Sequence, residues 1–403
     1  MQSETSRPSD TYSPLYFLAS LGAGGLAVTF FMWLMHWLPH PGKTVPVFED
    51  IMAAFAAGTP LTQGMIVVAV TGIAVFAVLN LKLLVWNLRR YAAWSKTESF
   101  AKFAKTNAQS QVLAMPLALA MSINVLFILG MVFVPGLWSV VEYLFPFALI
   151  GFLAIGAYAL KLYGAFLGRV LTEGGFNCAA NNNFGQVLPA FAFAMVGVGL
   201  AAPAAMSTLP AVAGTGLVLS TFFLMTSGLI AVVAMMLGLR SMMENGANAE
   251  TAPTLSIIVP LLAVLGILSL RQSHGLETHF GSAATAGETL ATLTKFLSVQ
   301  VLFLLFAGLI LIRQGYAGRF LFGRETSPGS YALVCPGVGF AVMVHFFVNK
   351  GLVDAGLIAK FGPTFWALTA IALLSQVAMI WLVFKLNRRH FGTPRTAAPV
   401  PAE

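Results

Sequence analysis

Ten apolar runs divide the sequence, and a short polar or turn-forming segment separates each run from the next. A helix needs roughly 20 apolar residues to cross the hydrocarbon core of a bilayer, and most of the runs reach that length. They cover about residues 15–37, 64–88, 111–134, 140–167, 184–203, 209–239, 254–270, 292–312, 329–349 and 364–386. The pattern predicts an all-α membrane protein with ten transmembrane helices.

The composition leaves little material for a soluble domain. Hydrophobic residues make up 58% of the chain and charged residues only 9%, whereas soluble domains carry about 25% charged residues. The first residues are polar and the first apolar run is too long for a cleaved signal peptide. We therefore expect a cytoplasmic tail over 1–14, a ten-helix membrane domain over 15–387 and a second cytoplasmic tail over 388–403.

Basic residues lie mainly on one side of the predicted membrane. With the N-terminus in the cytoplasm, most of the 22 Lys and Arg residues fall in inner segments, and the loop Arg89–Lys105 is the most basic. The outer loops then hold only Lys43, Arg271, Lys350 and Lys360. Cytoplasmic loops are enriched in Lys and Arg, so both termini are predicted to be cytoplasmic. The net charge of +8 thus indicates topology and contact with anionic lipid, and no nucleic-acid partner.

Prolines favour the odd-numbered runs. Runs three, five, seven and nine each carry one near the start, and among the even runs only the fourth has a counterpart, Pro146. The four are Pro116, Pro189, Pro260 and Pro336. A proline removes a backbone donor and kinks a helix, which a membrane tolerates where other helices or a wet cavity satisfy the freed carbonyl. The odd runs are predicted to form an interior and the even runs a lipid-facing jacket, although glycine and proline are also generally commoner in membrane helices.

Ionisable residues are rare inside the runs. No Asp or Glu falls in the middle of one, which argues against the carboxylate relay of a strongly proton-driven pump. His36 and His345 lie towards the outer ends of runs one and nine. They are the only candidates for the matched histidine pair that a haem or quinone site requires, and a buried histidine such as His345 is more often a helix contact than a ligand.

Small neutral groups supply the remaining interior polarity. Hydroxyl groups and helix-end amides suit an anion, because they attract it without a full counter-charge that would trap it. Each serine could equally bond to a carbonyl of its own helix. The candidate pore residues of this kind are Ser20, Ser122, Ser256 and Ser330. The two cysteines, Cys178 and Cys335, predict neither a disulfide framework nor a metal cluster, and we expect no cofactor and no enzymatic activity.

Three segments carry a resemblance to a known family. Ser327–Gly339 reads SPGSYALVCPGVG, Ala252–Pro260 reads APTLSIIVP and Tyr16–Gly25 reads YFLASLGAGG. They resemble the openings of the ninth, seventh and first spans of the tellurite-resistance/dicarboxylate transporter family, which includes the plant guard-cell slow anion channels. The third span around Met115 and Pro116 is similar as well. Within the family, the chain resembles a bacterial branch with selenoprotein members.

The resemblance implies an architecture and a location. It implies ten helices arranged as five hairpins around a quasi-fivefold axis, with the odd helices lining a central pore. It also implies an integral protein of the bacterial cytoplasmic (inner) membrane, and trimers occur in the resembled family.

Position 335 departs from the family pattern. The family places a phenylalanine just before the ninth-span proline, where its ring occludes the pore, whereas this chain has Cys335 before Pro336. If Pro336 kinks the helix, residues beside it project towards the axis. Two interpretations remain open: another aromatic closes the path, or the thiol faces the pore centre. Cys335 is also compatible with a small packing residue.

The leading hypothesis is a channel or transporter that moves a small anion, including sulfur- or selenium-containing species, across the membrane. The alternative is a membrane anchor subunit of a quinol- or haem-linked redox enzyme. Both classes fit ten apolar helices with few interior charges. Anion flux and the visible absorption of the purified protein distinguish the two.

Overall fold

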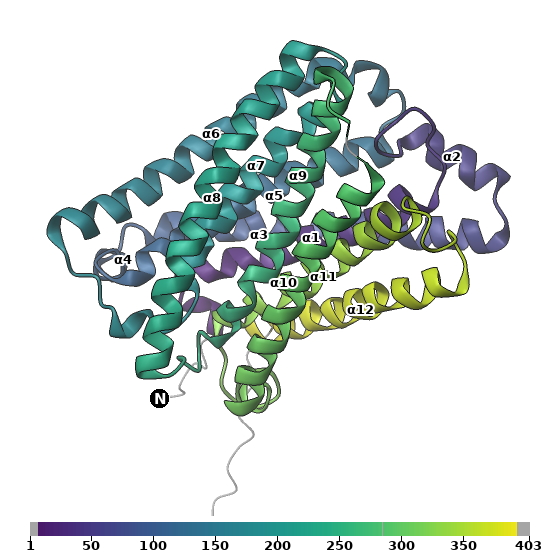
Figure 1. Ribbon diagram of the computed structural model, residues 1–403. Coiled ribbons are helices and arrows are strands. Elements are labelled where there is room, and N and C mark those ends of the chain that lie inside the picture. Colours follow the sequence, from purple (N-terminus) through teal and green to yellow (C-terminus); the bar gives the residue numbers. More distant parts are fainter. Residues whose placement is uncertain (1–6, 284, 393–403) are drawn as a thin grey trace, which may run out of the picture.

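The computed structural model describes residues 7–283 and 285–392, and helices account for most of this part of the chain (Figure 1). Ten helices are long and apolar enough to cross a membrane, which confirms the predicted number. Two short helices, α2 (Phe48–Ala57) and α4 (Glu98–Phe103), lie in the connections. The ten spans contain α1 (Phe17–Trp37), α3 (Pro60–Trp94), α5 (Ala114–Phe133), α6 (Leu137–Glu173), α7 (Leu188–Met206), α8 (Pro210–Asn245), α9 (Ile258–Phe280), α10 (Ala286–Arg313), α11 (Val334–Phe346) and α12 (Pro363–Phe391). Helix α11 has 13 residues, and its span Pro328–Val353 is completed by a 3-10 segment before it and a π-helix, Phe347–Val353, after it.

Burial alternates along the chain. In the five odd-numbered spans, built on α1, α5, α7, α9 and α11, between 67% and 94% of the most apolar window is buried. In the even-numbered spans, α3, α6, α8, α10 and α12, the buried share is only 11% to 39%. The exposed residues of the even spans are large and apolar, as a lipid-facing surface requires. The predicted division into interior and jacket helices is therefore present in the fold.

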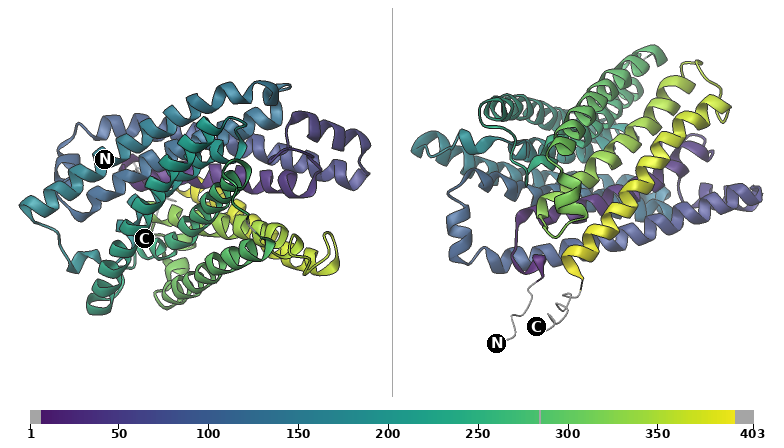
Figure 2. Two further views of the ribbon diagram at one scale, coloured as in Figure 1. Left: turned by 45° about the horizontal axis from the view of Figure 1, so that its top comes forward. Right: turned by 90° about the horizontal axis from the view of Figure 1, so that it is seen from below.

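The buried helices contact one another in a closed sequence. Helix α1 packs against α5, α5 against α7, α7 against α9, α9 against α11, and α11 against α1 again. Each buried helix also packs against the long helix that follows it in the chain. Figure 2 shows the long even helices on the outside of the molecule.

Each buried helix begins with a 3-10 segment that runs directly into it. Pro336 and Pro260 are the third residues of α11 and α9, and Pro189 is the second residue of α7. A proline in the first turn removes an N–H that has no intrahelical acceptor, so it costs little there. The prolines thus mark the change from 3-10 to α geometry, where the sequence analysis expected a kink. The segments are Pro14–Tyr16, Asn107–Leu113, Gly185–Val187, Ala252–Ile257 and Pro328–Leu333.

Small residues allow the buried helices to approach closely. A Cβ atom built on Gly22 of α1 would lie 2.8 Å from Val334 Cγ1, and one on Gly25 would lie 2.7 Å from Val338 Cγ1. On α11, a Cβ atom at Gly339 would lie 2.7 Å from the Cα atom of Pro260. Contacts this short exclude any larger residue without movement of the neighbouring helix, a packing mode typical of membrane helices.

Three boundaries differ from the prediction. Helix α9 continues ten residues past the predicted end of the seventh run, so Arg271 lies inside a helix and not in an outer loop. Pro203 lies within α7, and the turn to α8 is Ser207–Leu209. Helix α12 extends to Phe391, into the predicted C-terminal tail. The remainder of that tail, 393–403, and residues 1–6 of the N-terminal tail lie outside the described residues.

The start of the first span and the end of the last lie on the same side of the bundle (Figure 2). The Tyr16 hydroxyl is 2.9 Å from His390 Nδ1, and Arg90 at the end of α3 is 3.6 Å from Asp10. The basic segment after α3 shares this side.

Thiol labelling tests whether the side of the bundle that holds both chain ends faces the cytoplasm. In a Cys178→Ser background, we expect Ser139→Cys to react with a membrane-impermeant maleimide in intact cells, because Ser139 is exposed at the opposite end of the bundle. We expect Ser99→Cys, exposed beside the basic segment, to react only after the membrane is permeabilised. The reverse pattern would contradict the cytoplasmic placement of both termini.

Candidate functional site

A cavity of about 870 Å³ lies among the buried helices. All five of them contribute to its wall, with additional residues from α6 and α10. Its mouth is the set of residues His40, Lys43, Glu277, Lys350 and Lys360, which follow or flank the ends of α1, α9 and α11. The cavity therefore opens on the side opposite the two termini.

The other end of the cavity is closed. Cys335 and Pro260, the second and third residues of α11 and α9, line it, together with Phe191 near the start of α7. The residues just before these, such as Val334, Val259 and Leu188, are fully buried in helix contacts. Packed first turns thus form the base of the cavity. Cys335 lies at this base, and Phe191 supplies an aromatic ring there.

Most of the cavity wall is apolar and rich in sulfur. Besides the Cys335 thiol, six methionines line it, namely Met32, Met35, Met121, Met131, Met195 and Met206. Thioether side chains are polarizable and adaptable, and they offer neither a full charge nor a strong donor. A solute in this space gains dispersion contacts from most of the wall and polar contacts from few positions.

Arg271 provides a positive charge in the cavity wall. It lies on α9, and its Nη1 donates a hydrogen bond of 2.7 Å to the carbonyl of Val198 on α7. Pro203 in α7 also leaves the Gly199 carbonyl without its intrahelical donor, so the backbone beside the guanidinium is rich in acceptors. Arg271 forms no salt bridge with any described residue. Its charge is therefore not neutralised by a carboxylate.

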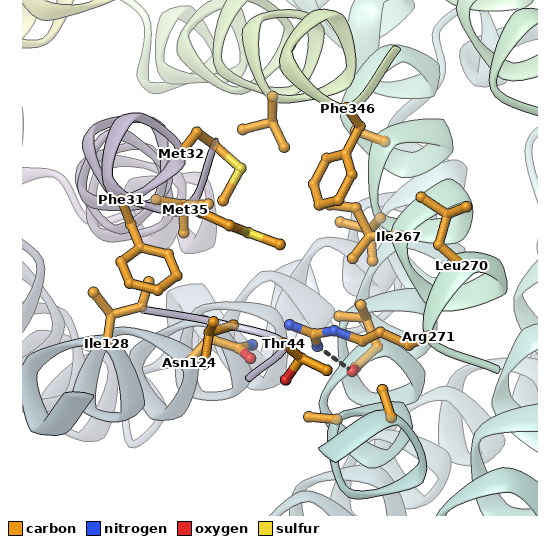
Figure 3. A pocket seen from close by; sticks show the side chains of 18 of the residues that line it. Phe31, Met32, Met35, Thr44, Asn124, Ile128, Ile267, Leu270, Arg271 and Phe346 are labelled. Atoms are coloured by element: carbon orange, nitrogen blue, oxygen red, sulfur yellow. Dashed lines mark hydrogen bonds between the residues drawn. The ribbon is translucent and has the colours of Figure 1, made fainter. Parts of the chain in front are cut away.

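Two uncharged polar side chains share the cavity with Arg271. Figure 3 shows the polar ends of Asn124, Thr44 and Arg271 on one side of the space, and Met32, Met35 and Phe346 on another. The Asn124 amide donates 3.1 Å to Ala120 in its own helix, whereas the buried Thr44 hydroxyl has no hydrogen-bond partner. The Thr44 hydroxyl is therefore available to donate to a solute.

Two of the three lysines at the mouth pair with carboxylates. Lys43 Nζ lies 2.7 Å from Asp50, and Lys350 Nζ lies 3.3 Å from Asp354. Lys360 Nζ stands 5.2 Å above the Phe361 ring and forms no salt bridge with a described residue. Burial lowers the pKa of His40 at the mouth, although its hydrogen bond to the Leu38 carbonyl acts in the opposite direction. An anion that enters therefore meets Lys360 at the mouth and Arg271 deeper in the cavity wall.

Of the seven predicted pore residues, Cys335 lines the cavity and the other six do not. Ser20 and Ser122 both face Asn80 of α3. The Asn80 amide donates to Ser20 O at 2.8 Å and to Ser20 Oγ at 3.0 Å, and Ser122 Oγ donates to Asn80 Oδ1 at 3.0 Å. These two serines therefore join α1, α3 and α5.

The remaining predicted residues lie near the closed end or beside the wall. Ser256 Oγ donates to Pro253 O in its own 3-10 segment at 2.7 Å. Ser330 Oγ is 2.7 Å from the Tyr316 hydroxyl. Pro336 follows Cys335 in the first turn of α11, and His345 is buried further along that helix.

The sequence analysis missed Arg271 as a cavity residue because hydropathy falls at residue 270. A different signal was present. The chain has no proline between Pro260 and Pro328. Because proline is a strong helix-ending signal, its absence after Leu270 was compatible with a helix that continues through the polar stretch.

No protein-family model matches the chain, and no curated protein matches it. Among the described residues, no group of three or more His, Cys, Asp or Glu side chains is placed to hold a metal ion.

The Asn80 hydrogen bonds generate a stability prediction. Asn80→Ala removes the bonds that join three helices, and interhelical hydrogen bonds in membranes contribute about 1–2 kcal/mol at most. We expect the free energy of unfolding in mixed micelles to fall by about that amount.

The matched control is Thr215→Ala on α8. Thr215 is exposed and its hydroxyl bonds only to the Ala211 carbonyl of its own helix, so its loss should leave stability unchanged. Equal effects of the two substitutions would contradict the joining role of Asn80.

Proposed function

We propose that the protein moves a small anion across the membrane through the space enclosed by its buried helices. The observation that carries this proposal is Arg271, a cation in the wall of a mostly apolar cavity that has no carboxylate partner among the described residues. A charge in such a position is costly unless an opposite charge visits it. An anion in the cavity supplies that opposite charge.

The attraction between Arg271 and an anion has a strength that suits transport. Two unit charges 4 Å apart interact by about 4 kcal/mol at the effective dielectric of a protein surface. The Val198 carbonyl shares the guanidinium and weakens its field at the anion. Conduction requires binding that is favourable enough for entry and weak enough for release. A single partly shared arginine meets both requirements better than a cluster of cations.

The proposal includes the architecture implied by the resemblance. Five hairpins around a quasi-fivefold axis would make the closed sequence of contacts α1–α5–α7–α9–α11 the wall of a central pore. In this arrangement the cavity is the outer vestibule, and the packed first turns form the barrier on the cytoplasmic side of a bacterial inner membrane. A homotrimer would bury part of the lipid-facing surface of the even helices.

The substrate class we propose is a small anion that includes sulfur- or selenium-containing species. The support is the sulfur-rich wall, with Cys335 at its base. Dispersion contacts with thioether groups favour large polarizable anions over small, strongly hydrated ones.

The second candidate is a membrane anchor for a quinol- or haem-linked redox enzyme. One observation favours it: the rings of His36 and His345 lie 6.3 Å apart with planes inclined by 16°. His345 does not line the cavity, however, and lies against Trp37 at a ring distance of 5.9 Å. Haem bands in the visible spectrum of the purified protein would support this candidate, and anion flux without such bands supports the first.

Substitution of Arg271 tests the proposed function. We expect Arg271→Gln to lower anion efflux from proteoliposomes by about tenfold or more, since the loss of about 1.4 kcal/mol of attraction already changes occupancy tenfold. Arg271→Lys should retain part of the flux, because it keeps the charge.

Arg240→Gln is the matched control. Arg240 is exposed on α8 and pairs with Glu244 at 2.9 Å, so its loss should leave efflux unchanged. Full activity of Arg271→Gln would remove the main support for anion transport by this cavity.

Substitution of Cys335 tests the base of the cavity. We expect Cys335→Phe to suppress flux strongly, because its ring adds bulk where the packed first turns already close the space. Cys335→Ala should preserve flux and abolish sensitivity to thiol oxidants.

The oxidant test needs Cys178→Ser as background, because Cys178 is exposed. If Cys335→Phe folds and conducts like the parent, Cys335 is a packing residue away from the path.

A further inference from the structure

Two buried histidines lie beside the cavity without hydrogen-bond partners among the described residues. His36 on α1 lines the cavity and is 4% exposed, and its Nε2 has no such partner. His345 on α11 is 1% exposed, and neither of its ring nitrogens has one. A neutral imidazole carries one donor and one acceptor, and buried polar atoms are nearly always satisfied. The described side chains therefore leave three nitrogens of this ring pair free to bond to another group or to bind a proton.

An acceptor stands next to the pair. Asn349, one helical turn after His345, donates its Nδ2 to the His345 carbonyl at 2.8 Å. Its Oδ1 has no partner, and the residue lines the cavity. Protonation turns both nitrogens of an imidazole into donors. Asn349 Oδ1 is an acceptor that one of these N–H donors could use.

The electrostatic surroundings decide when the pair accepts a proton. The titratable groups whose charge acts on His36 are all basic: His345, Lys350, Lys360 and His40. Helix α5 contains no ionisable residue, and those of α3 and α12 lie towards the opposite end of the bundle. Helix α9 contributes three charged or titratable residues to the cavity wall, namely Arg271, His274 and Glu277. The Asp354 carboxylate forms a salt bridge with Lys350. An additional positive charge is thus repelled until a negative charge enters.

We propose that the His36–His345 pair binds one proton when an anion occupies the cavity, so that the protein couples anion binding to proton uptake. This inference rests on the proposed function, since it requires an anion at Arg271. The proton comes from hydronium in the water at the mouth: one O–H bond breaks, one N–H bond forms on an imidazole nitrogen, and a water molecule remains. A monovalent anion and its proton then add no net charge to the cavity.

Coupling of this kind is reciprocal. If anion binding takes up one proton, a lower pH must strengthen anion binding, by up to about tenfold per pH unit while the pair titrates. A chain without mid-span carboxylates can link anion and proton movement in this way, through histidines alone.

Isothermal titration calorimetry tests the coupling. Full-length protein in nanodiscs is titrated with sodium nitrate and with sodium thiosulfate, in buffers of different ionisation enthalpy between about pH 5 and about pH 8. We expect uptake of about one proton per anion and tighter binding at lower pH. His36→Gln and His345→Gln should each bind anion without proton uptake. The control His279→Gln should behave like the parent, because the His279 ring bonds to the Ser207 carbonyl and does not line the cavity.

The outcomes separate the two proposals. Anion binding by the parent protein without proton uptake overturns the coupling and leaves anion transport standing. Proton uptake that persists in both His36→Gln and His345→Gln also overturns it. Absence of both anion binding and anion flux in the parent protein overturns the proposed function and the coupling together.

Discussion

Close packing among the first turns of the five buried helices supports the rest of the structure. Glycines at positions 22, 25 and 339 let α1, α11 and α9 approach to contacts that no larger residue permits. Lipid offers no partner for a backbone N–H or C=O group, so the 3-10 entries must be covered by protein. The long even helices provide that cover. The packed turns thereby form a dense base, and the cavity lies between the later turns of the same helices.

Buried polar atoms are partly satisfied at both ends of the bundle. At the closed end, Tyr16 pairs with His390 and the Tyr331 hydroxyl donates a hydrogen bond of 2.8 Å to Asn387, whereas Thr251 and Gln314 each keep one atom without a partner among the described residues. At the open end, atoms of Thr44, His36 and Asn349 have no partners within the described residues. These three residues line the cavity, so the unsatisfied atoms at the open end belong to residues that a solute in the cavity meets.

The sequence predicted the membrane class, the number of spans and the division into interior and jacket helices. These follow from hydropathy and from proline position, which are local properties. The role of Asn80 was not predictable, because its partners Ser20 and Ser122 lie on other helices and the pairing depends on helix rotation. Arg271 was missed for a related reason: hydropathy marks where a chain leaves lipid, but not where a helix ends. Cys335 was placed at the pore by resemblance, and its position at the base of the cavity depends on packing that no single segment specifies.

The difference in length between the two helix sets affects the surrounding lipid. Helix α3 has 35 residues and α6 has 37, which at 1.5 Å per residue gives about 50–55 Å of helix. The hydrocarbon core is about 30 Å thick, so these helices either tilt strongly or project beyond it. Tilt and local thickening of the bilayer both cost free energy that depends on membrane thickness. The jacket therefore makes the stability of the protein sensitive to acyl-chain length, and short-chain detergents or thin bilayers impose a strain that the buried helices do not experience directly.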